Sequence, residues 1–102
     1  MLKKQYLKSK PVVKVTFSFP EAEAGEATQA RSVQLVGDFN DWTDSTPMKR
    51  QKDGRFSVLL ELEKDRAYQF RYLVDGQEWY NDWQADQYTP NPFNSENSVV
   101  LT

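Results

Sequence analysis

The sequence predicts an all-β fold, an immunoglobulin-like antiparallel β-sandwich of about six to eight short strands. Several short segments alternate apolar and polar side chains with the two-residue period of a half-buried strand. Turn signals separate these segments at close spacing, and no segment has the 3.6-residue period of a helix. The 102 residues leave room for one domain with one core. A small barrel is the alternative architecture.

The first half of the chain contains two predicted strands. Residues 11–19 alternate apolar and polar side chains, and Pro20 ends that strand. Residues 21–30 are rich in Ala and Glu without an apolar period, so we expect a mobile surface loop, with a marginal helical turn as the alternative. Residues 33–36 form a short apolar run typical of a buried strand, and Gly37 begins a polar loop.

The second half contains the most regular strand. An Asp-Gly pair precedes a strand over residues 55–63, and a second Asp-Gly pair predicts a hairpin turn between strands 67–74 and 78–80. Residues 81–97 are polar and aromatic and contain prolines, so they are expected to form a loop before a last short strand at 98–101. In the 67–74 strand, one face is expected to point inward: Tyr68, Phe70, Tyr72 and Val74.

Composition excludes several classes of function. The chain has 13 basic and 15 acidic residues, a formal net charge of -2, and therefore lacks the basic footprint of a nucleic-acid-binding protein. It has no cysteine and no histidine, so disulfides, thiolate metal sites and nucleophile–histidine pairs are excluded. We expect no enzyme, no cofactor and no nucleic-acid partner. A neutral ligand fits this charge balance best.

The N-terminus is expected to be a flexible basic tail over residues 1–10, followed by a single domain over residues 11–102. The tail has four lysines but no apolar stretch, which is not the pattern of a signal peptide. No segment approaches the roughly 20 apolar residues of a membrane span. A soluble cytoplasmic protein without a membrane partner is therefore expected.

Two groups of acidic residues have the composition of a metal or catalytic site. Counted from Asp38, a calcium loop would need glycine at Thr43 and a bidentate glutamate at Lys49, so the match fails and no metal site is predicted. The carboxylates of Asp38, Asp41 and Asp44 are expected to cap turns. A glycosidase would need two carboxylates at a fixed separation, but turn formation is the better interpretation for the remaining candidates. They are Asp75, Asp82 and Asp86.

Aromatic residues carry a stronger signal, because four of them fall outside the alternating core positions. They are Trp42, Trp79, Tyr80 and Trp83. Neutral sugars stack on aromatic rings while polar side chains hold their hydroxyl groups. Gln69 and Arg71 are expected on the outer face of the most regular strand, and Asn81 and Asn97 flank the last loop. From the residues alone, a saccharide platform and rings that close the end of the sandwich both stay open.

Two motifs in order resemble one family. They are residues 37–42 (GDFNDW) and 70–76 (FRYLVDG), and the segment 96–100 (ENSVV) follows them. The chain resembles carbohydrate-binding module family 48, the isoamylase early-set or glycogen-binding domains. It is similar to stand-alone bacterial early-set proteins and to the glycogen-binding domain of the AMP-activated kinase β subunit. The resemblance runs from about residue 12 to residue 101 and implies an early-set β-sandwich.

The resemblance also implies a site and a ligand. Trp42 and Trp79 would stack on glucose, while Arg71 and Asn97 would bind its hydroxyl groups. Less certain candidates are Trp83, Tyr80 and Phe93. The implied function is non-catalytic binding of an α-1,4-linked glucan or malto-oligosaccharide, with a glycogen-metabolising enzyme or a regulatory protein as a partner in trans. The alternative is a regulatory or protein-interaction domain that keeps the early-set fold without sugar binding.

Overall fold

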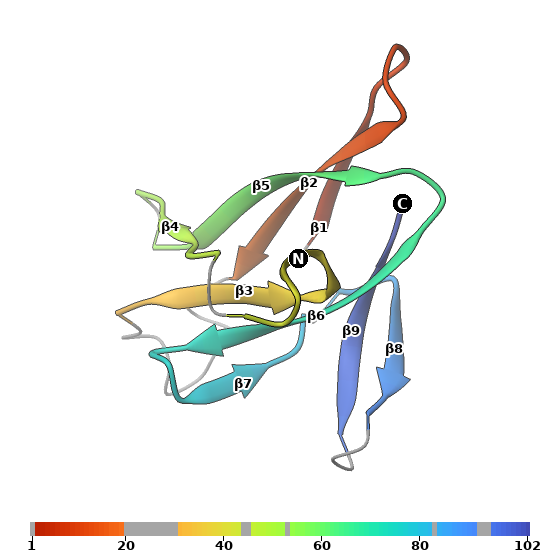
Figure 1. Cartoon of the computed structure of the whole chain (residues 1–102). Helices are drawn as coiled ribbons and strands as arrows, with labels where there is room; N and C mark the ends of the chain where they lie inside the picture. Colours follow the sequence, from red (N-terminus) through yellow and green to blue (C-terminus); the bar gives the residue numbers. More distant parts are fainter. Residues whose placement is uncertain (1, 20–30, 44–45, 53, 83, 92–94) are drawn as a thin grey trace.

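The computed structural model describes residues 2–19, 31–43, 46–52, 54–82, 84–91 and 95–102. Within these ranges, nine strands form two antiparallel sheets that lie one above the other (Figure 1), which confirms the predicted all-β sandwich. Sheet A has the strand order β1 (Leu2–Tyr6), β2 (Val12–Phe19), β5 (Phe56–Glu63) and β4 (Lys49–Arg50). Sheet B has the order β3 (Val33–Gly37), β6 (Ala67–Val74), β9 (Glu96–Leu101) and β8 (Gln87–Pro90), with β7 (Glu78–Tyr80) also on β6.

The core lies between alternate side chains of β2 and β6, as their periodicity predicts. Phe17 packs edge-on against Phe70 with ring centroids 5.1 Å apart, and Phe19 lies 5.2 Å from the ring of Tyr72. All four aromatic side chains are fully buried. Each such ring pair adds about 0.5–1.5 kcal/mol beyond the burial of its apolar area. The most regular strand of the sequence is therefore the central strand of the fold.

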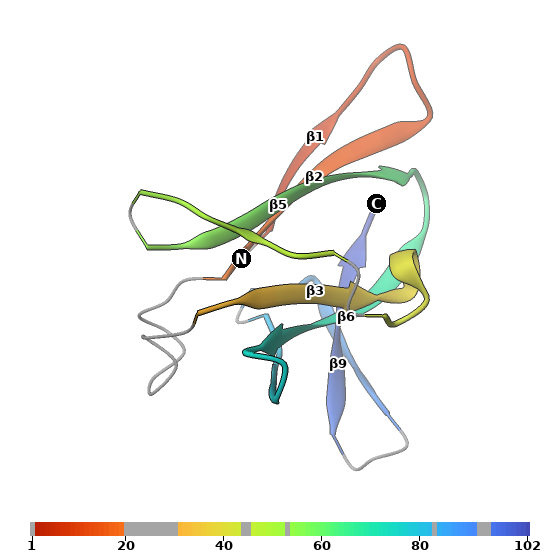
Figure 2. The same ribbon diagram turned by 60° about the vertical axis from the view of Figure 1, so that its left-hand side comes forward.

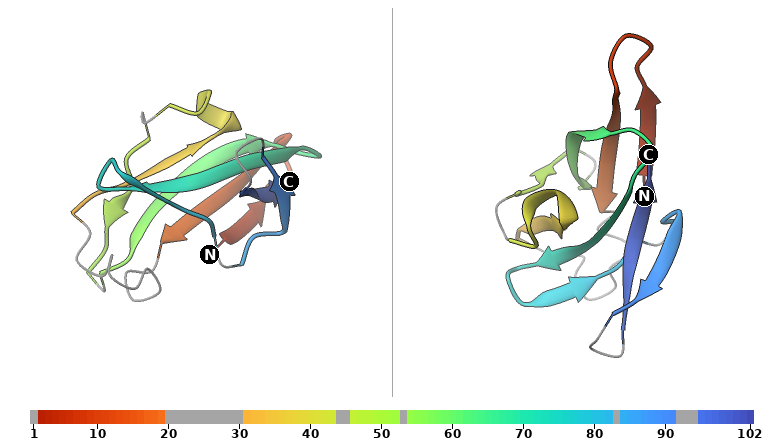
Figure 3. Two further views of the ribbon diagram at one scale, coloured as in Figure 1. Left: turned by 90° about the horizontal axis from the view of Figure 1, so that it is seen from below. Right: turned by 45° about the vertical axis from the view of Figure 1, so that its right-hand side comes forward.

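Strand β6 organises sheet B. Along one edge it pairs with β3, and along the other edge its two halves pair with different strands. The half near Phe70 pairs with β9, and the half near Tyr72 pairs with β7. The views in Figures 2 and 3 show β6 twisting through the sheet as it passes from one partner to the other. Its outward-facing side chains consequently share one surface with residues of β3, β7 and β9.

The expected flexible tail is wrong for residues 2–6. They form β1, which pairs with β2 from Leu2 opposite Phe17 to Tyr6 opposite Val13. The Lys4 ammonium also makes a 2.6 Å ion pair with the carboxylate of Asp86. The segment lacks clean alternation because it is held by backbone hydrogen bonds at a sheet edge, where composition is weakly constrained.

Two further strands lie in segments expected to be loops. β8 occupies residues 87–90 of the predicted 81–97 loop, and β4 occupies two residues of the loop after Gly37. Both are short edge strands whose side chains are mainly exposed, so they carry little apolar signal. The predicted loop at residues 21–30 lies outside the described residues. Among the residues that are described, no helix is long and apolar enough to cross a membrane.

Candidate functional site

The outer face of sheet B, which points away from the core, gathers most of the predicted site. In the register, Trp79 lies opposite Leu73, and Val99 lies opposite Gln69. Because side chains alternate along a strand, residues 69, 71 and 73 of β6 point away from the core. We use the name outer face of sheet B for the surface formed by Gln34, Gln69, Arg71, Leu73, Trp79 and Asn97.

Arg71 and Trp79 form the centre of this face. The guanidinium carbon lies 5.9 Å from the centroid of the Trp79 ring, within the range of a cation–π contact. Trp79 is 45% exposed, so much of the ring remains open to solvent. The Nε of Arg71 is buried without a hydrogen-bond partner among the described residues, and burial lowers the pKa of its guanidinium. A buried N–H donor without a partner is uncommon in folded proteins and marks a group that a ligand can satisfy.

Gln34 is a candidate site residue that the sequence did not predict. It pairs with Leu73 and lies on the same face as Arg71, one diagonal position away across the β3–β6 pair. Its Oε1 is a buried acceptor that has no hydrogen-bond partner within the described residues. The only sequence signal is a single polar residue at an outward position of the apolar run VQLV. The outer face thus holds an unsatisfied donor and an unsatisfied acceptor.

Trp42 is linked to the backbone of β6 by a carboxylate. It follows η2 (Asp38–Asn40), a single 3-10 helical turn after β3, and its side chain is 37% exposed. The indole Nε1 donates to Oδ1 of Asp38 at 2.8 Å, and Oδ2 of Asp38 accepts from the backbone N–H of Gln69 at 2.7 Å. Asp38 therefore anchors the ring to β6. The turn cap expected for this carboxylate is not observed, because the backbone N–H that it binds belongs to strand β6.

Asn40 holds the backbone of this loop. Its Oδ1 accepts from the N–H of Gly37 at 3.0 Å, and its Nδ2 donates to the carbonyl oxygen of Leu35 at 2.8 Å. Asp41 and Trp42 adopt left-handed φ angles of 56° and 58°, which cost energy for residues other than glycine. The loop is thus a fixed structure that presents the Trp42 ring at a set position.

Gly37 permits the close approach of this loop to β6. A Cβ at residue 37 would lie 2.8 Å from the Cβ of Phe70 and closer still to the carbonyl oxygen of Gln69. No side chain fits in that space without moving the backbone. The glycine of the GDFNDW motif is therefore required by packing between β3 and β6.

Asn97 lies on the outer face, but protein groups already bind its side chain. Its Nδ2 donates to Oε1 of Gln69 at 3.0 Å, and its Oδ1 accepts from Nδ2 of Asn91 at 3.1 Å. The amide is half-buried and held in one orientation by these two contacts. Asn97 can therefore orient Gln69 as well as contact a ligand directly.

Of the less certain candidates, Tyr80 is the one among the described residues, and it does not lie on this face. Tyr80 pairs with Tyr72 on the inward side of the sheet, and its ring lies 5.7 Å from Phe19. Its hydroxyl donates to the carboxylate of Glu78 at 3.0 Å. Because neighbouring residues of β7 point to opposite faces, Tyr80 does not share a face with Trp79, and sugar binding by Tyr80 stays a prediction. Trp83 and Phe93 lie outside the described residues.

The three aspartates considered for catalysis all have structural contacts. Asp82 is buried and accepts from the Tyr72 hydroxyl at 2.6 Å. Burial of the Tyr72 hydroxyl and the neighbouring Asp82 carboxylate both raise the pKa of that hydroxyl. Asp75 accepts from two backbone N–H groups before β3, and Asp86 pairs with Lys4. In the described part of the chain, no group of three or more acidic side chains is placed to hold a metal ion.

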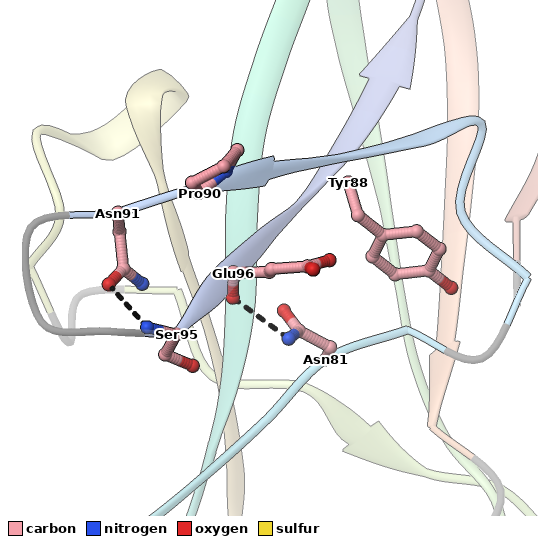
Figure 4. A pocket seen from close by; sticks show the side chains of 6 residues that line it. All are labelled: Asn81, Tyr88, Pro90, Asn91, Ser95 and Glu96. Atoms are coloured by element: carbon pink, nitrogen blue, oxygen red, sulfur yellow. Dashed lines mark hydrogen bonds between the residues drawn. The ribbon is translucent and has the colours of Figure 1, made fainter.

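A pocket of about 640 Å³ opens beside the β8–β9 pair (Figure 4). Its lining mixes one aromatic ring with polar side chains. The residues are Asn81, Tyr88, Pro90, Asn91, Ser95 and Glu96. None of these residues was predicted as a site residue, although Asn81 was noted beside the last loop. A tyrosine in an edge strand gives no sequence signal of its own.

Comparisons with known proteins identify relatives of this chain. The family model for the glycogen recognition site of AMP-activated protein kinase matches residues 26–101. Curated relatives include Cruciform DNA-recognizing protein 1 from Saccharomyces cerevisiae strains RM11-1a and JAY291. Each is 34% identical over 64 residues, which cover 60% of this chain and 12% of the relative. The chain thus spans a small part of the length of these relatives.

Proposed function

The chain belongs to the family of glycogen recognition domains of AMP-activated protein kinase, and we propose that it binds α-1,4-linked glucan on the outer face of sheet B. In this proposal Trp79 and Trp42 stack on sugar rings. Arg71 donates to hydroxyl groups, and Asn97 orients the neighbouring amide of Gln69. The ligand is bound and not transformed, because the aspartates considered for catalysis are committed to structural contacts.

The observation that carries the proposal is the unpartnered Arg71 cation over an exposed tryptophan ring. Within the described residues, the guanidinium makes no hydrogen bond or ion pair, and its Nε is buried. Satisfying buried donors is worth about 1–3 kcal/mol to a ligand that supplies acceptors. A sugar provides hydroxyl acceptors at its edges and apolar C–H groups on its faces, which matches this pair of side chains.

The platform is longer than one sugar ring. Trp42 is anchored through Asp38 at residue 69 of β6, whereas Trp79 pairs with residue 73. These two points on β6 are about 13 Å apart along the strand. A short oligosaccharide can reach both ends. Single-site affinity should be modest because an open face buries little area and exchanges water for hydroxyl groups. Branched polymers gain avidity only when several domains are linked.

Native gel electrophoresis in glycogen or amylopectin tests the proposal. Retardation of the wild type should be lost in Trp79→Ala and weakened in Trp42→Ala. Tyr6→Ala is the matched control, since Tyr6 is an aromatic residue on sheet A that is 55% exposed. Absence of retardation of the folded wild type at high polysaccharide concentration contradicts glucan binding. It favours the alternative, a protein-interaction domain with an early-set fold.

The name of the yeast relatives makes DNA a necessary control ligand. The net charge of -2 remains the reason to propose that nucleic acid is not bound, because phosphate contacts require clustered cations. A mobility-shift assay with a four-way DNA junction at low salt should show no complex. A complex that weakens steeply as salt increases would contradict this part of the proposal.

A further inference from the structure

We propose that the pocket beside β8 and β9 is a second binding site for a neutral sugar unit, separate from the outer face of sheet B. We define the hairpin pocket by its described lining residues, Asn81, Tyr88, Pro90, Asn91, Ser95 and Glu96. The choice of a glucan unit as its ligand rests on the proposed function. The existence and the chemistry of the site rest on the contacts described below.

The hairpin pocket and the outer face lie on opposite sides of the same two strands. Tyr88 pairs with Ser98, and Pro90 pairs with Glu96. Ser98 is fully buried and points inward, so Tyr88, Pro90 and Glu96 share its side, whereas Asn97 points to the other. A ligand on one side therefore leaves the other side accessible.

Tyr88 provides a fixed aromatic surface. Its side chain is 43% exposed, and its hydroxyl donates to the backbone carbonyl oxygen of Asp82, which belongs to the buried polar network. That hydrogen bond fixes the ring while leaving much of its surface open. A rigid amphipathic ring loses little conformational entropy when it stacks on the face of a sugar.

The polar lining suits hydroxyl groups. In Figure 4 the Glu96 side chain extends towards the Tyr88 ring, with Asn81 beside it. The Glu96 carboxylate has no hydrogen-bond partner among the described residues, and its two oxygens can accept from two adjacent hydroxyls of one sugar ring. Asn81 is held by two contacts, because its Nδ2 donates to the Glu96 carbonyl at 2.9 Å and its Oδ1 accepts from Ser98 at 2.9 Å.

The charge and size of the hairpin pocket narrow the ligand class. No lysine or arginine is among its described lining residues, which disfavours an anion. Its volume of about 640 Å³ lies in the range of small-molecule sites. One aromatic surface, one carboxylate and neutral amides form the combination that a neutral polyhydroxylated ring needs. Asn91 lines the pocket and also donates to Asn97, so a contact crosses between the two sites.

The test is a titration of ¹⁵N-labelled Trp79→Ala protein with maltoheptaose, followed by NMR. We expect the Asn81 side-chain amide and the backbone amides of Ser95 and Glu96 still to shift when the outer face is disabled. Glu96→Ala in the same background should weaken this binding about tenfold, the effect of losing one charge-assisted hydrogen bond or two neutral ones. Glu61→Ala, an exposed carboxylate on sheet A, is the matched control and should leave the affinity unchanged.

The outcomes separate this inference from the proposed function. If the signals of the pocket residues shift in the wild type but not in Trp79→Ala, the shifts are transmitted from the outer face and the inference is overturned. The inference is also overturned if only the Trp79 indole signal shifts in the wild type. Pocket shifts without any shift of the Trp79 indole support the inference and contradict the outer-face proposal. Ethylammonium shifting the same signals while maltoheptaose leaves them unchanged identifies a cation site and overturns the inference. Absence of all shifts overturns both.

Discussion

The two faces of sheet B differ in how their buried polar atoms are hydrogen-bonded. On the inward side, the Tyr72 hydroxyl donates to Asp82, and the backbone N–H of Asp82 donates to Ser98. On the outer face, the Nε of Arg71 and the Oε1 of Gln34 are buried without a described partner. Because an unsatisfied buried group costs about 1–3 kcal/mol, two such groups on one face indicate a use for that face other than stability. The inward network around Tyr72 and Asp82 stabilises the fold, and we propose that the unsatisfied groups of the outer face serve recognition.

The largest expected effect comes from breaking the inward network. Asp82→Ala leaves the buried Tyr72 hydroxyl and the N–H of Gln84 without their acceptor, so it should lower the free energy of unfolding by about 2–4 kcal/mol. Urea unfolding measures the loss, with the exposed Glu61→Ala as a control expected within about 0.5 kcal/mol. An equal loss in both variants would show that Asp82 has no special structural role.

Alkaline pH tests the same network without a substitution. Burial and Asp82 raise the pKa of Tyr72 well above its usual 10.0, so the unfolded chain loses this proton before the folded chain does. The folded state then binds more protons, and its stability should fall as pH rises above about 10, by about 1.4 kcal/mol per pH unit. Unfolding measured from pH 8 to 11 should show this slope reduced in Tyr72→Phe. An unchanged slope in that variant would assign the effect to other groups.

A change at the centre of the outer face should affect affinity and leave stability nearly intact. Arg71→Ala removes the donor over Trp79, so maltoheptaose should bind about five- to tenfold more weakly. The free energy of unfolding should change by less than about 0.5 kcal/mol, since Arg71 makes no described hydrogen bond. Arg66→Ala removes an exposed cation elsewhere and should leave the affinity unchanged. Equal affinity in both variants would exclude Arg71 from the site.

The smallest expected effect is at Gln34. Gln34→Leu replaces an unsatisfied acceptor with an apolar group of similar size, so stability should stay equal or increase slightly. Affinity for maltoheptaose should fall about two- to threefold if the ligand donates a hydroxyl to Oε1. Calorimetric titration measures the second change and urea unfolding the first. A clear loss of stability would show that Gln34 serves the fold and not recognition.

The sequence predicted the parts of the fold that depend on apolar alternation. β2 and β6 were recognised because each must bury one face, and β6 was placed from Ala67 to Val74 as observed. β1 and β8 were missed because they pair through the backbone at sheet edges. Their side chains carry no apolar period. Edge pairing is decided by the neighbouring strand, which a local pattern does not reveal.

The candidate site was predictable where a motif fixes both residue type and register. Trp42 and Arg71 belong to the two motifs, Trp79 follows the second, and Arg71 and Trp79 lie on one face. Tyr80 lies on the face opposite Trp79, because adjacent residues of β7 face opposite sides of the sheet. Gln34 was missed because the burial of one oxygen atom depends on neighbours from other strands. The anchoring of Trp42 through Asp38 likewise joins residues that are far apart in the sequence.

The most direct measurement is an NMR titration of wild-type protein with maltoheptaose that follows the indole N–H signals of Trp42 and Trp79. Single Trp→Phe variants assign these signals and separate them from that of Trp83. If one glucan chain lies across the outer face, both indole signals shift along one isotherm with a single Kd, while the backbone amide signal of Glu61 on sheet A stays still. Shifts with two different Kd values, or no shift at Trp79, would contradict a single platform built from both tryptophans.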